Sequence, residues 1–247
     1  MSRIGIIGGS GLAKLDNLQI IRREMVQTPY GEPSGPVISG TLSGHEVVFL
    51  ARHGYGHTIP PHKINYRANV WAFKTLGVEK IVAAAAVGGI RDDMAPGRLA
   101  IPDQIVDYTR ARVSSYFDGG EDGGVQHIDF SYPYSERLRQ SLIKACQTFA
   151  IDAAYEGVYG VTEGPRLETA AEINRMERDG CSIVGMTAMP EAALARELGL
   201  EYATCAFVVN WAAGRSGGII KMKDIEHFLH VGTTRLRKLL AGVVSLL

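Results

Sequence analysis

Residues 65–89, NYRANVWAFKTLGVEKIVAAAAVGG, contain a helix signal followed directly by a buried-strand signal. Asn65 can cap a helix over Tyr66 to Leu76, and Gly77 is the residue type that ends one. Lys80 to Val87 is then a short apolar run closed by two glycines, which is typical of a buried strand. This succession predicts a β-loop-helix-β rhythm, the repeating element of α/β proteins.

The same alternation of patterns continues on both sides of this segment. Short apolar runs predict strands at Ile4–Ile7, in a hairpin over Val37–Ala51 that turns at Ser43-Gly44, and at about Glu156–Val161, Ser182–Gly185 and Tyr202–Val209. Helical spacing predicts helices from Ser135 to about Phe149, over about Glu168–Asp179 and Pro190–Leu198, and in a C-terminal stretch from Lys223 that Gly232 interrupts. The expected fold is therefore α/β, a single domain over residues 1–247 with a mixed, mostly parallel twisted sheet flanked by helices.

Composition and charge argue against several classes of protein, among them nucleic-acid-binding, membrane-spanning and secreted proteins. The 247 residues carry 26 Lys plus Arg and 26 Asp plus Glu, so binding of nucleic acid or a membrane through bulk charge is not expected. The longest nearly uninterrupted apolar run, Ile81–Ile90, is about half as long as a bilayer crossing, and the N-terminus has too short an apolar stretch for a signal peptide. Three cysteines without a C-x-x-C pair, Cys146, Cys181 and Cys205, argue against disulfides and zinc and favour a reducing cytoplasm.

Ligands of open α/β sheets bind beyond the carboxyl ends of the strands, and four such ends here have unusual sequences. They are Gly8–Gly11, Ala51–Gly54, Ala86–Gly89 and Val209–Trp211. The glycines of the first end let backbone N–H groups approach an anion, and Ser10 adds a hydroxyl, although a plain tight turn is the alternative. The dinucleotide fingerprint G-x-G-x-x-G fails because Lys14 stands at the third glycine position.

Arg52 and His53 close an apolar strand and are of the residue types that bind phosphate. Arg52 offers a bidentate fork and His53 a further donor, although a solvated loop is the alternative. Three histidines, at positions 53, 57 and 62, invite a metal hypothesis. We reject it because the glycines and prolines of this segment prevent a helix and no carboxylate lies within it.

Two further polar residues stand where a ligand would need them. Glu168 follows the Gly164-Pro165 turn, and the alternative reading is a first-turn acid favoured by the helix dipole. Asn210 follows an apolar run and needs a hydrogen-bond partner, for which a purely structural bond is the alternative.

Together these segments resemble the trimeric purine nucleoside phosphorylase and methylthioadenosine phosphorylase family. The likeness runs in order through residues 4–12, 51–54, 57–66, 163–166 and 185–191 and covers nearly the whole chain. The resemblance implies phosphorolysis, in which a nucleoside and phosphate give a free purine and a sugar 1-phosphate. It also implies a homotrimer, with inorganic phosphate as co-substrate and no cofactor or metal.

The resemblance assigns the phosphate site residue by residue. It places phosphate between Ser10, Arg52, His53, the backbone at Ala86, and Thr187, and it places Met186 under the ribose. The methylthioadenosine branch usually has threonine where this chain has Ala85. One hydroxyl donor to phosphate is therefore absent at that position.

The base pocket resembles the inosine and guanosine branch. Methylthioadenosine phosphorylases carry aspartate at the position of Asn210 and a second one at Ala212, and they have serine at that of Glu168. By this reading Asn210, with Trp211 and Ala212 beside it, donates to purine N7 and O6. Glu168, an acceptor-only carboxylate, accepts from N1–H, which a 6-oxopurine carries and adenine does not.

The 5′ end resembles the methylthio branch instead. There a histidine matching His127 reaches into the neighbouring subunit's pocket, and an apolar residue near Met222 replaces a hydroxyl-binding histidine. The combination predicts 5′-methylthioinosine as the preferred substrate, with Asn210, Glu168 and His53 as the catalytic residues. The alternatives are a general inosine and guanosine phosphorylase, a methylthioadenosine phosphorylase, and a purine-binding protein without turnover.

Overall fold

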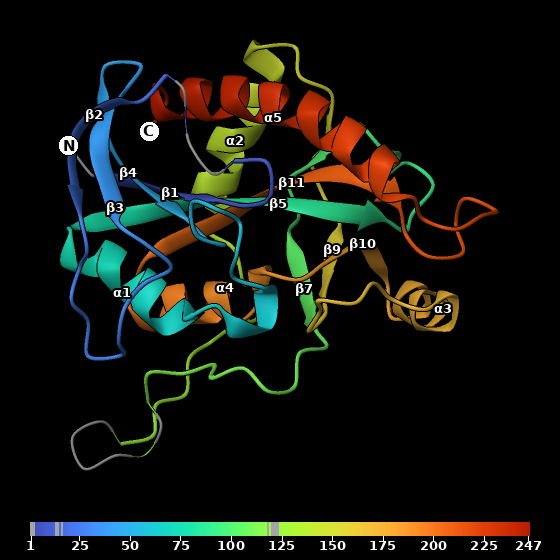
Figure 1. Cartoon of the computed structure of the whole chain (residues 1–247), viewed down its shortest axis with the longest axis horizontal. Coiled ribbons are helices and arrows are strands. Elements are labelled where there is room, and N and C mark those ends of the chain that lie inside the picture. Colours follow the sequence, from blue (N-terminus) through green and yellow to red (C-terminus); the bar gives the residue numbers. More distant parts are fainter. Residues whose placement is uncertain (1–2, 13–14, 16, 118, 120–123) are drawn as a thin grey trace.

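The helices of this chain pack around an eleven-stranded sheet (Figure 1). The structure is a computed structural model that describes residues 3–12, 15, 17–117, 119 and 124–247. Lys14 lies outside the described residues. The strands are β1 (Arg3–Gly8), β2 (Gln19–Glu24), β3 (Val37–Leu42), β4 (His45–Ala51), β5 (Val78–Gly89), β6 (Leu99–Ala100), β7 (Gln104–Asp107), β8 (Ala153–Ala154), β9 (Val158–Val161), β10 (Cys181–Gly185) and β11 (Glu201–Trp211). The helices are η1 (Pro61–Lys63), α1 (Tyr66–Thr75), α2 (Glu136–Thr148), α3 (Ala170–Arg178), α4 (Ala188–Glu197) and α5 (Met222–Val244).

The sheet branches at its longest strand. Its main path is β2-β3-β4-β1-β5-β10-β9-β7, and β11 also pairs with β5 and carries β6 and then β8. The pairs of β1 with β4 and β5, of β5 with β11, and of β9 with β10 are parallel, whereas β5 and β10 are antiparallel. The predicted mixed, mostly parallel α/β sheet is confirmed.

The segment that predicted the fold has the expected local structure. The Asn65 side chain accepts a hydrogen bond from the backbone N–H of Ala68 at the start of α1. Gly77 has a φ of 72°, the left-handed conformation that ends a helix without steric cost to glycine. The predicted hairpin turn is also present, with Ser43 and Gly44 both at positive φ between the antiparallel β3 and β4.

Helices cover both faces of the sheet and bury two large clusters of apolar side chains, and a smaller cluster lies between α3 and β10. In Figure 1, α2 and α5 lie on one side of β1, β5 and β11, and α1 and α4 lie on the other. The alternation of side chains along β5 supplies both large clusters, because Ile81 and Ala83 pack with α1 and α4 while Val82 and Ala84 pack with α2 and α5.

Three differences from the predicted elements bear on the residues proposed for the site or on the helix beside them. α5 is continuous through Gly232, whose missing Cβ would stand 1.9 Å from the Phe207 ring, so this glycine permits close packing on β11 and does not break the helix. α3 is capped by Thr169, so Glu168 precedes the helix and is not a first-turn acid. β11 extends to Trp211, past the predicted end at Val209.

The short strands β2, β6, β7 and β8 were not predicted. Among the described residues, no helix has both the length and the apolar character of a membrane crossing.

Candidate functional site

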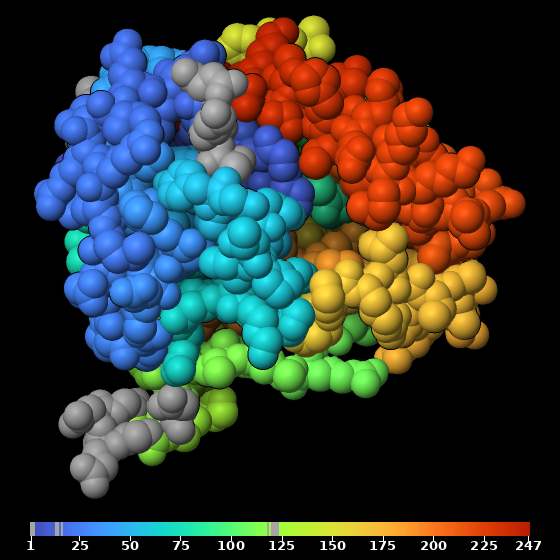
Figure 2. Space-filling model, viewed as in Figure 1, coloured from blue at the N-terminus to red at the C-terminus, as the bar shows by residue number. Residues whose placement is uncertain are grey.

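A cavity of about 580 Å³ opens at the carboxyl ends of the parallel strands β1, β4, β5 and β11. Figure 2 shows the surface hollowed between the cyan segment that follows β4 and the orange-red first half of α5. The lining includes most residues proposed from the sequence: Ser10, Arg52, His53, Ala85, Ala86, Glu168, Met186, Thr187, Asn210, Ala212 and Met222. Segments that are far apart in the chain thus meet in one place, as expected for an open α/β sheet.

Arg52 is held rigidly in the cavity wall. Its side chain is 1% exposed, and Nε and Nη2 each donate to a carboxylate oxygen of Glu191 at 2.7 Å. Nη1 donates to the carbonyl of Ala84 at 2.8 Å. The fork expected to hold phosphate is therefore occupied by Glu191. One hydrogen on each terminal nitrogen is left for a ligand.

Glu191 is a site residue that the sequence reasoning missed. It is fully buried on α4 and also accepts a hydrogen bond from the Tyr202 hydroxyl at 2.8 Å. Burial lowers the pKa of Arg52, but the charge and hydrogen bonds of Glu191 outweigh it, so the net pKa is raised. Burial, reinforced by Glu191, also raises the pKa of Tyr202 well above its usual value. The sequence signal that could have identified Glu191 is an acidic residue within the apolar run of α4.

His53 carries its proton on Nδ1. This atom lies 2.8 Å from the carbonyl oxygen of Ile59, and because a carbonyl can only accept, Nδ1 donates. Burial, and then the positive charge of Arg52, lower the pKa of His53 to about 4. The imidazole is therefore neutral at pH 7, and Nε2 is an acceptor, not the further donor expected from the sequence.

The turn after β1 approaches Arg52 closely. A Cβ on Gly9 would lie 2.5 Å from the Ala84 carbonyl oxygen and 3.1 Å from Nη1 of Arg52, so only glycine fits there. This close approach brings Ser10, the next residue, to the cavity wall beside Arg52.

Thr187 stands at the N-terminus of α4 and is buried. It is the N-cap residue, but its side chain makes no capping hydrogen bond. Thr187 and Ser10 thus contribute two hydroxyl groups to a wall that also contains the Arg52 cation.

Asn210 reaches the cavity through an irregularity in β11. The register between β11 and β5 shifts between Val208 and Asn210, which pairs Asn210 with Gly88. The side-chain Nδ2 donates to the carbonyl of Trp211 at 2.7 Å. One amide hydrogen and Oδ1 are left for a ligand, so Asn210 offers a base a single donor hydrogen rather than two.

Glu168 enters the cavity from the loop between β9 and α3. Thr162 Oγ1 donates to its Oε1 at 2.6 Å. The neighbouring Arg166 lies outside the lining and pairs with Glu172, its Nη1 and Nη2 at 2.8 and 2.7 Å from the two carboxylate oxygens. Of this loop, Pro165, Leu167 and Glu168 line the cavity.

One wall of the cavity is apolar and comes from α5. Met222, Ile225 and Leu229 line it at helical spacing. The sequence placed Met222 here, whereas Ile225 and Leu229 were not among the predicted site residues. His57 also lines the cavity, although the sequence assigned no ligand to it. Its ring centroid lies 4.6 Å from that of His53.

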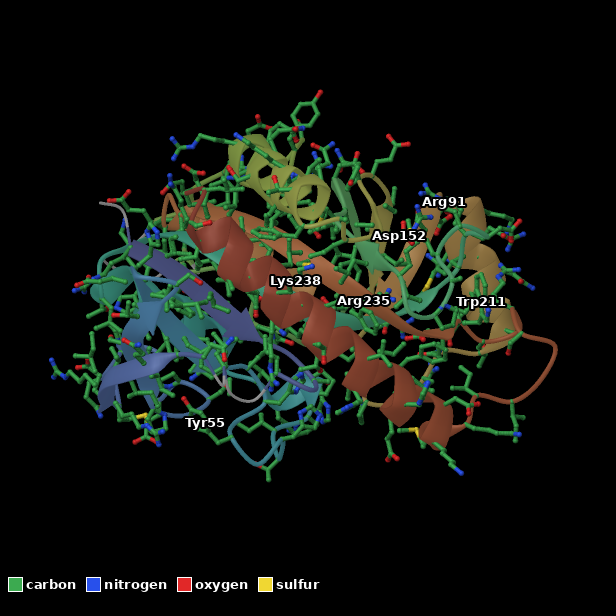
Figure 3. The ribbon with its side chains drawn as sticks, turned by 90° about the horizontal axis from the view of Figure 1, so that it is seen from above. Tyr55, Arg91, Asp152, Trp211, Arg235 and Lys238 are labelled. Atoms are coloured by element: carbon green, nitrogen blue, oxygen red, sulfur yellow. The ribbon has the colours of Figure 1, made fainter. Side chains whose placement is uncertain are left out.

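Two proposed substrate-binding residues are not part of this lining. Trp211 follows Asn210 at the end of β11 (Figure 3) but does not line the cavity. His127 lies on the exposed segment before α2. No group of three metal-ligating His, Cys, Asp or Glu side chains occurs within the described ranges.

Comparison with known proteins relates this chain to nucleoside-cleaving enzymes. The family profile described as the phosphorylase superfamily matches residues 3–245. A probable S-methyl-5′-thioinosine phosphorylase of Pseudomonas syringae pv. tomato is 53% identical over 99% of both chains. A 6-oxopurine nucleoside phosphorylase of Pyrococcus furiosus is 45% identical over 100% of this chain and 94% of its own.

The solved structures give the same relationship. Methylthioadenosine phosphorylase from Schistosoma mansoni in complex with adenine superposes with a TM-score of 0.94. The two chains are 33% identical, and the match covers 100% of this chain and 91% of the other.

Proposed function

Because this chain belongs to the phosphorylase superfamily, we propose that it catalyses phosphorolysis of 6-oxopurine nucleosides, with S-methyl-5′-thioinosine preferred. The products are hypoxanthine and 5-methylthioribose 1-phosphate. The observation that carries the proposal is the shared cavity, in which hydroxyl and guanidinium donors for an anion meet the Glu168 carboxylate and the Asn210 amide. The relatives named for this activity and for 6-oxopurine nucleosides support it.

The phosphate side of the reaction uses Arg52, Ser10 and Thr187 as donors. A phosphate oxygen attacks the anomeric carbon of the ribose while the bond from that carbon to the purine nitrogen breaks. Both electrons of the broken bond leave with the purine. The donors hold the attacking phosphate in place, so their contribution is positioning and electrostatic, not covalent.

His53 accepts a hydrogen bond from the O–H group of phosphate in the proposed reaction. Dihydrogen or hydrogen phosphate has an O–H group, and the unprotonated Nε2 of His53 can accept a hydrogen bond from it. A neutral acceptor here leaves the anionic phosphate oxygens to the donors of Arg52, Ser10 and Thr187. This division explains why the phosphate wall contains an imidazole that does not ionise near pH 7.

The base side discriminates by hydrogen-bond polarity. Glu168 accepts from the N1–H of a 6-oxopurine, whereas adenine would present an acceptor lone pair to the same carboxylate. Asn210 donates its one remaining amide hydrogen to the departing purine, where negative charge collects as the bond breaks.

The sugar side favours an apolar 5′ substituent. Met222, Ile225 and Leu229 form a hydrocarbon wall, and burying an unpaired 5′-hydroxyl against it would cost about 1–3 kcal/mol. A second candidate is a general inosine and guanosine phosphorylase. It is favoured by the 62% exposure of Met222, because a hydroxyl near an open wall can stay hydrated.

The deciding experiment compares kcat/KM for four nucleosides in the presence of phosphate: methylthioinosine, inosine, methylthioadenosine and adenosine. A lead of tenfold or more for methylthioinosine, about 1.4 kcal/mol, supports both the base and the 5′ assignments. Equal cleavage of inosine would replace the first candidate by the second. A lead for methylthioadenosine would overturn the base assignment, and base release without phosphate, or no release, would leave a purine-binding protein.

The proposed enzyme is a cytoplasmic homotrimer that uses phosphate as co-substrate and no cofactor or metal. In that assembly His127 of one subunit completes the 5′ pocket of its neighbour, as the resemblance implies. Light scattering should give the mass of three 26.7 kDa chains. A monomer mass would exclude the shared pocket, and loss of activity on treatment with EDTA would contradict the absence of a metal.

A further inference from the structure

Thr162 makes the hydrogen bond that fixes the carboxylate of Glu168. The hydroxyl donates to Oε1 at 2.6 Å, whereas its distance to the other nearby acceptor, the carbonyl oxygen of Gly185, is 3.4 Å. A threonine hydroxyl has one proton to donate, and the shorter contact takes it. Oε1 of Glu168 therefore accepts the Thr162 hydroxyl, which fixes the direction in which the remaining acceptor positions, Oε2 foremost, face a ligand.

The backbone of Thr162 is itself rigidly attached. Its N–H donates to the carbonyl of Gly185 at 2.8 Å, directly after the last pair of β9 and β10. Its carbonyl accepts from Nη2 of the buried Arg112 at 3.2 Å. A β-branched side chain on a fixed backbone has few rotamers, so the hydroxyl is held in one position.

The loop that carries Glu168 is less constrained. Leu167, immediately before it, is 41% exposed, and Arg166 is exposed with its guanidinium on Glu172 at the surface. A glutamate on such a loop has several rotamers unless a neighbouring group selects one of them. The Thr162 hydroxyl selects the rotamer in which the carboxylate lines the cavity.

We propose that Thr162 is a specificity-determining positioning residue, which orients Glu168 so that the enzyme prefers 6-oxopurine over 6-aminopurine nucleosides. This inference rests on the proposed function. Thr162 does not line the cavity, so it acts through Glu168 and touches no reacting atom. Its effect is confined to bases that bear a proton at N1, because only these use the oriented acceptor.

The test compares Thr162→Val, which keeps the shape and removes the donor, with Thr162→Ser, which keeps the donor. In the full-length enzyme, Thr162→Val should lower kcat/KM for methylthioinosine about tenfold, because a hydrogen bond to a charged group is lost. The KM for phosphate and kcat/KM for methylthioadenosine should change less than twofold. Thr162→Ser should restore most of the loss. The matched control is Thr75→Val, since Thr75 is exposed on α1 and its hydroxyl donates to the carbonyl of Trp71 in the same helix.

A double-mutant cycle separates positioning from a general structural effect. If Thr162 acts through Glu168, Thr162→Val should have no further effect on a Glu168→Ala background, in which the acceptor of the Thr162 hydroxyl is gone. An equal loss on both backgrounds, an equal loss for both bases, or an unchanged Thr162→Val enzyme would overturn the proposal. If Thr162→Val does not fold, the serine variant and Thr162→Ala are measured in its place, with circular dichroism as the folding check.

Binding of free bases keeps this test independent of turnover. Calorimetric titration with hypoxanthine and with adenine should show that Thr162→Val weakens hypoxanthine about tenfold and leaves adenine unchanged. If the wild-type enzyme releases no base from any 6-oxopurine nucleoside, the proposed function fails, while the hypoxanthine titration still decides the role of Thr162. Equal affinity of hypoxanthine for wild type and Thr162→Val would reject that role even in an active phosphorylase.

Discussion

Arg52 and Glu191 form a bidentate ion pair in the wall of the cavity, with both arginine donors 2.7 Å from the carboxylate oxygens and both side chains at most 1% exposed. A buried pair of this kind is strongly destabilising to break, because the remaining charge loses its partner. The pair also fixes which guanidinium hydrogens face the cavity. It therefore links the stability of the fold to the geometry of the proposed phosphate site.

Glu191→Gln should damage phosphate binding more than nucleoside binding. The amide cannot accept two charged hydrogen bonds from Arg52, so we expect at least a tenfold higher KM for phosphate with a nearly unchanged KM for nucleoside. The unfolding free energy should fall by about 3 kcal/mol. Steady-state kinetics and urea denaturation measure the two effects. Glu177→Gln, which alters an exposed pair with Arg215, is the control, and an equal effect of both substitutions would contradict the expectation.

His53 should make the protein less stable in mild acid. Its folded-state pKa is about 4, below the usual 6.5, so the unfolded chain binds more protons between these values. The contribution is complete above pH 6.5 and is lost as the pH falls toward 4, by at most about 3 kcal/mol. Denaturation of wild type and His53→Asn at pH 7 and pH 4.5 tests this. A wild-type loss no larger than that of the variant would show that His53 is not responsible.

Replacing Asn210 by aspartate together with Glu168 by serine should shift base preference. The serine removes the acceptor that requires a proton at N1, and the aspartate accepts from an N–H instead of donating one. The ratio of kcat/KM for methylthioadenosine to that for methylthioinosine should rise at least tenfold. An unchanged ratio would mean that these two residues do not read the base.

Arg112→Lys should loosen the loops around the cavity. The buried guanidinium donates to the Tyr66 hydroxyl and to the carbonyls of Met189, Thr162 and Glu163, a set that one ammonium cannot reproduce. We expect the KM for nucleoside to rise about tenfold, and the melting temperature to fall by several degrees. Arg110→Lys on the exposed side of the same segment is the control. The idea is wrong if both variants behave like wild type.

Gly232→Ala should destabilise the protein although alanine is the better helix former. The new Cβ would overlap the buried Phe207 ring at 1.9 Å, and overpacking of this kind costs about 1–3 kcal/mol. Gly218→Ala, with nothing within 4 Å of its Cβ, is the control. Thermal unfolding compares the two, and a partial rescue by Phe207→Leu would confirm the contact. A more stable Gly232→Ala protein would exclude the clash.

The elements that could be predicted from the sequence are those with long periodic patterns. α1, β5 and the hairpin of β3 and β4 each combine an apolar period with a cap or turn residue, and these signals act over a few neighbouring residues. The strands β6 and β8 have two residues each, and β2 is an edge strand with mostly exposed side chains. Such strands exist only through pairing with distant segments, so no local pattern marks them.

The site was predicted from residue types at strand ends. The predictions failed where a contact made only in the folded chain decides what a residue does. Glu191 lies in an apolar helix run, and only its contact with Arg52 makes it part of the site. The neutral tautomer of His53 depends on the carbonyl of Ile59 and on burial beside Arg52. The position of Asn210 follows from the register shift of β11 on β5, which a single strand sequence does not specify.

The sequence alone determined that this chain forms an α/β sheet with anion-binding and base-binding residue types at its strand ends, because periodicity, caps and residue chemistry are local properties. The tertiary structure decided which of their donors and acceptors are left for a ligand. Arg52 donates two hydrogen bonds to Glu191, and Asn210 donates one to the carbonyl of Trp211. Glu168 accepts a hydrogen bond from the Thr162 hydroxyl. Arg52 and Glu191 lie 139 residues apart in the chain, so only folding brings their charged groups within hydrogen-bond distance.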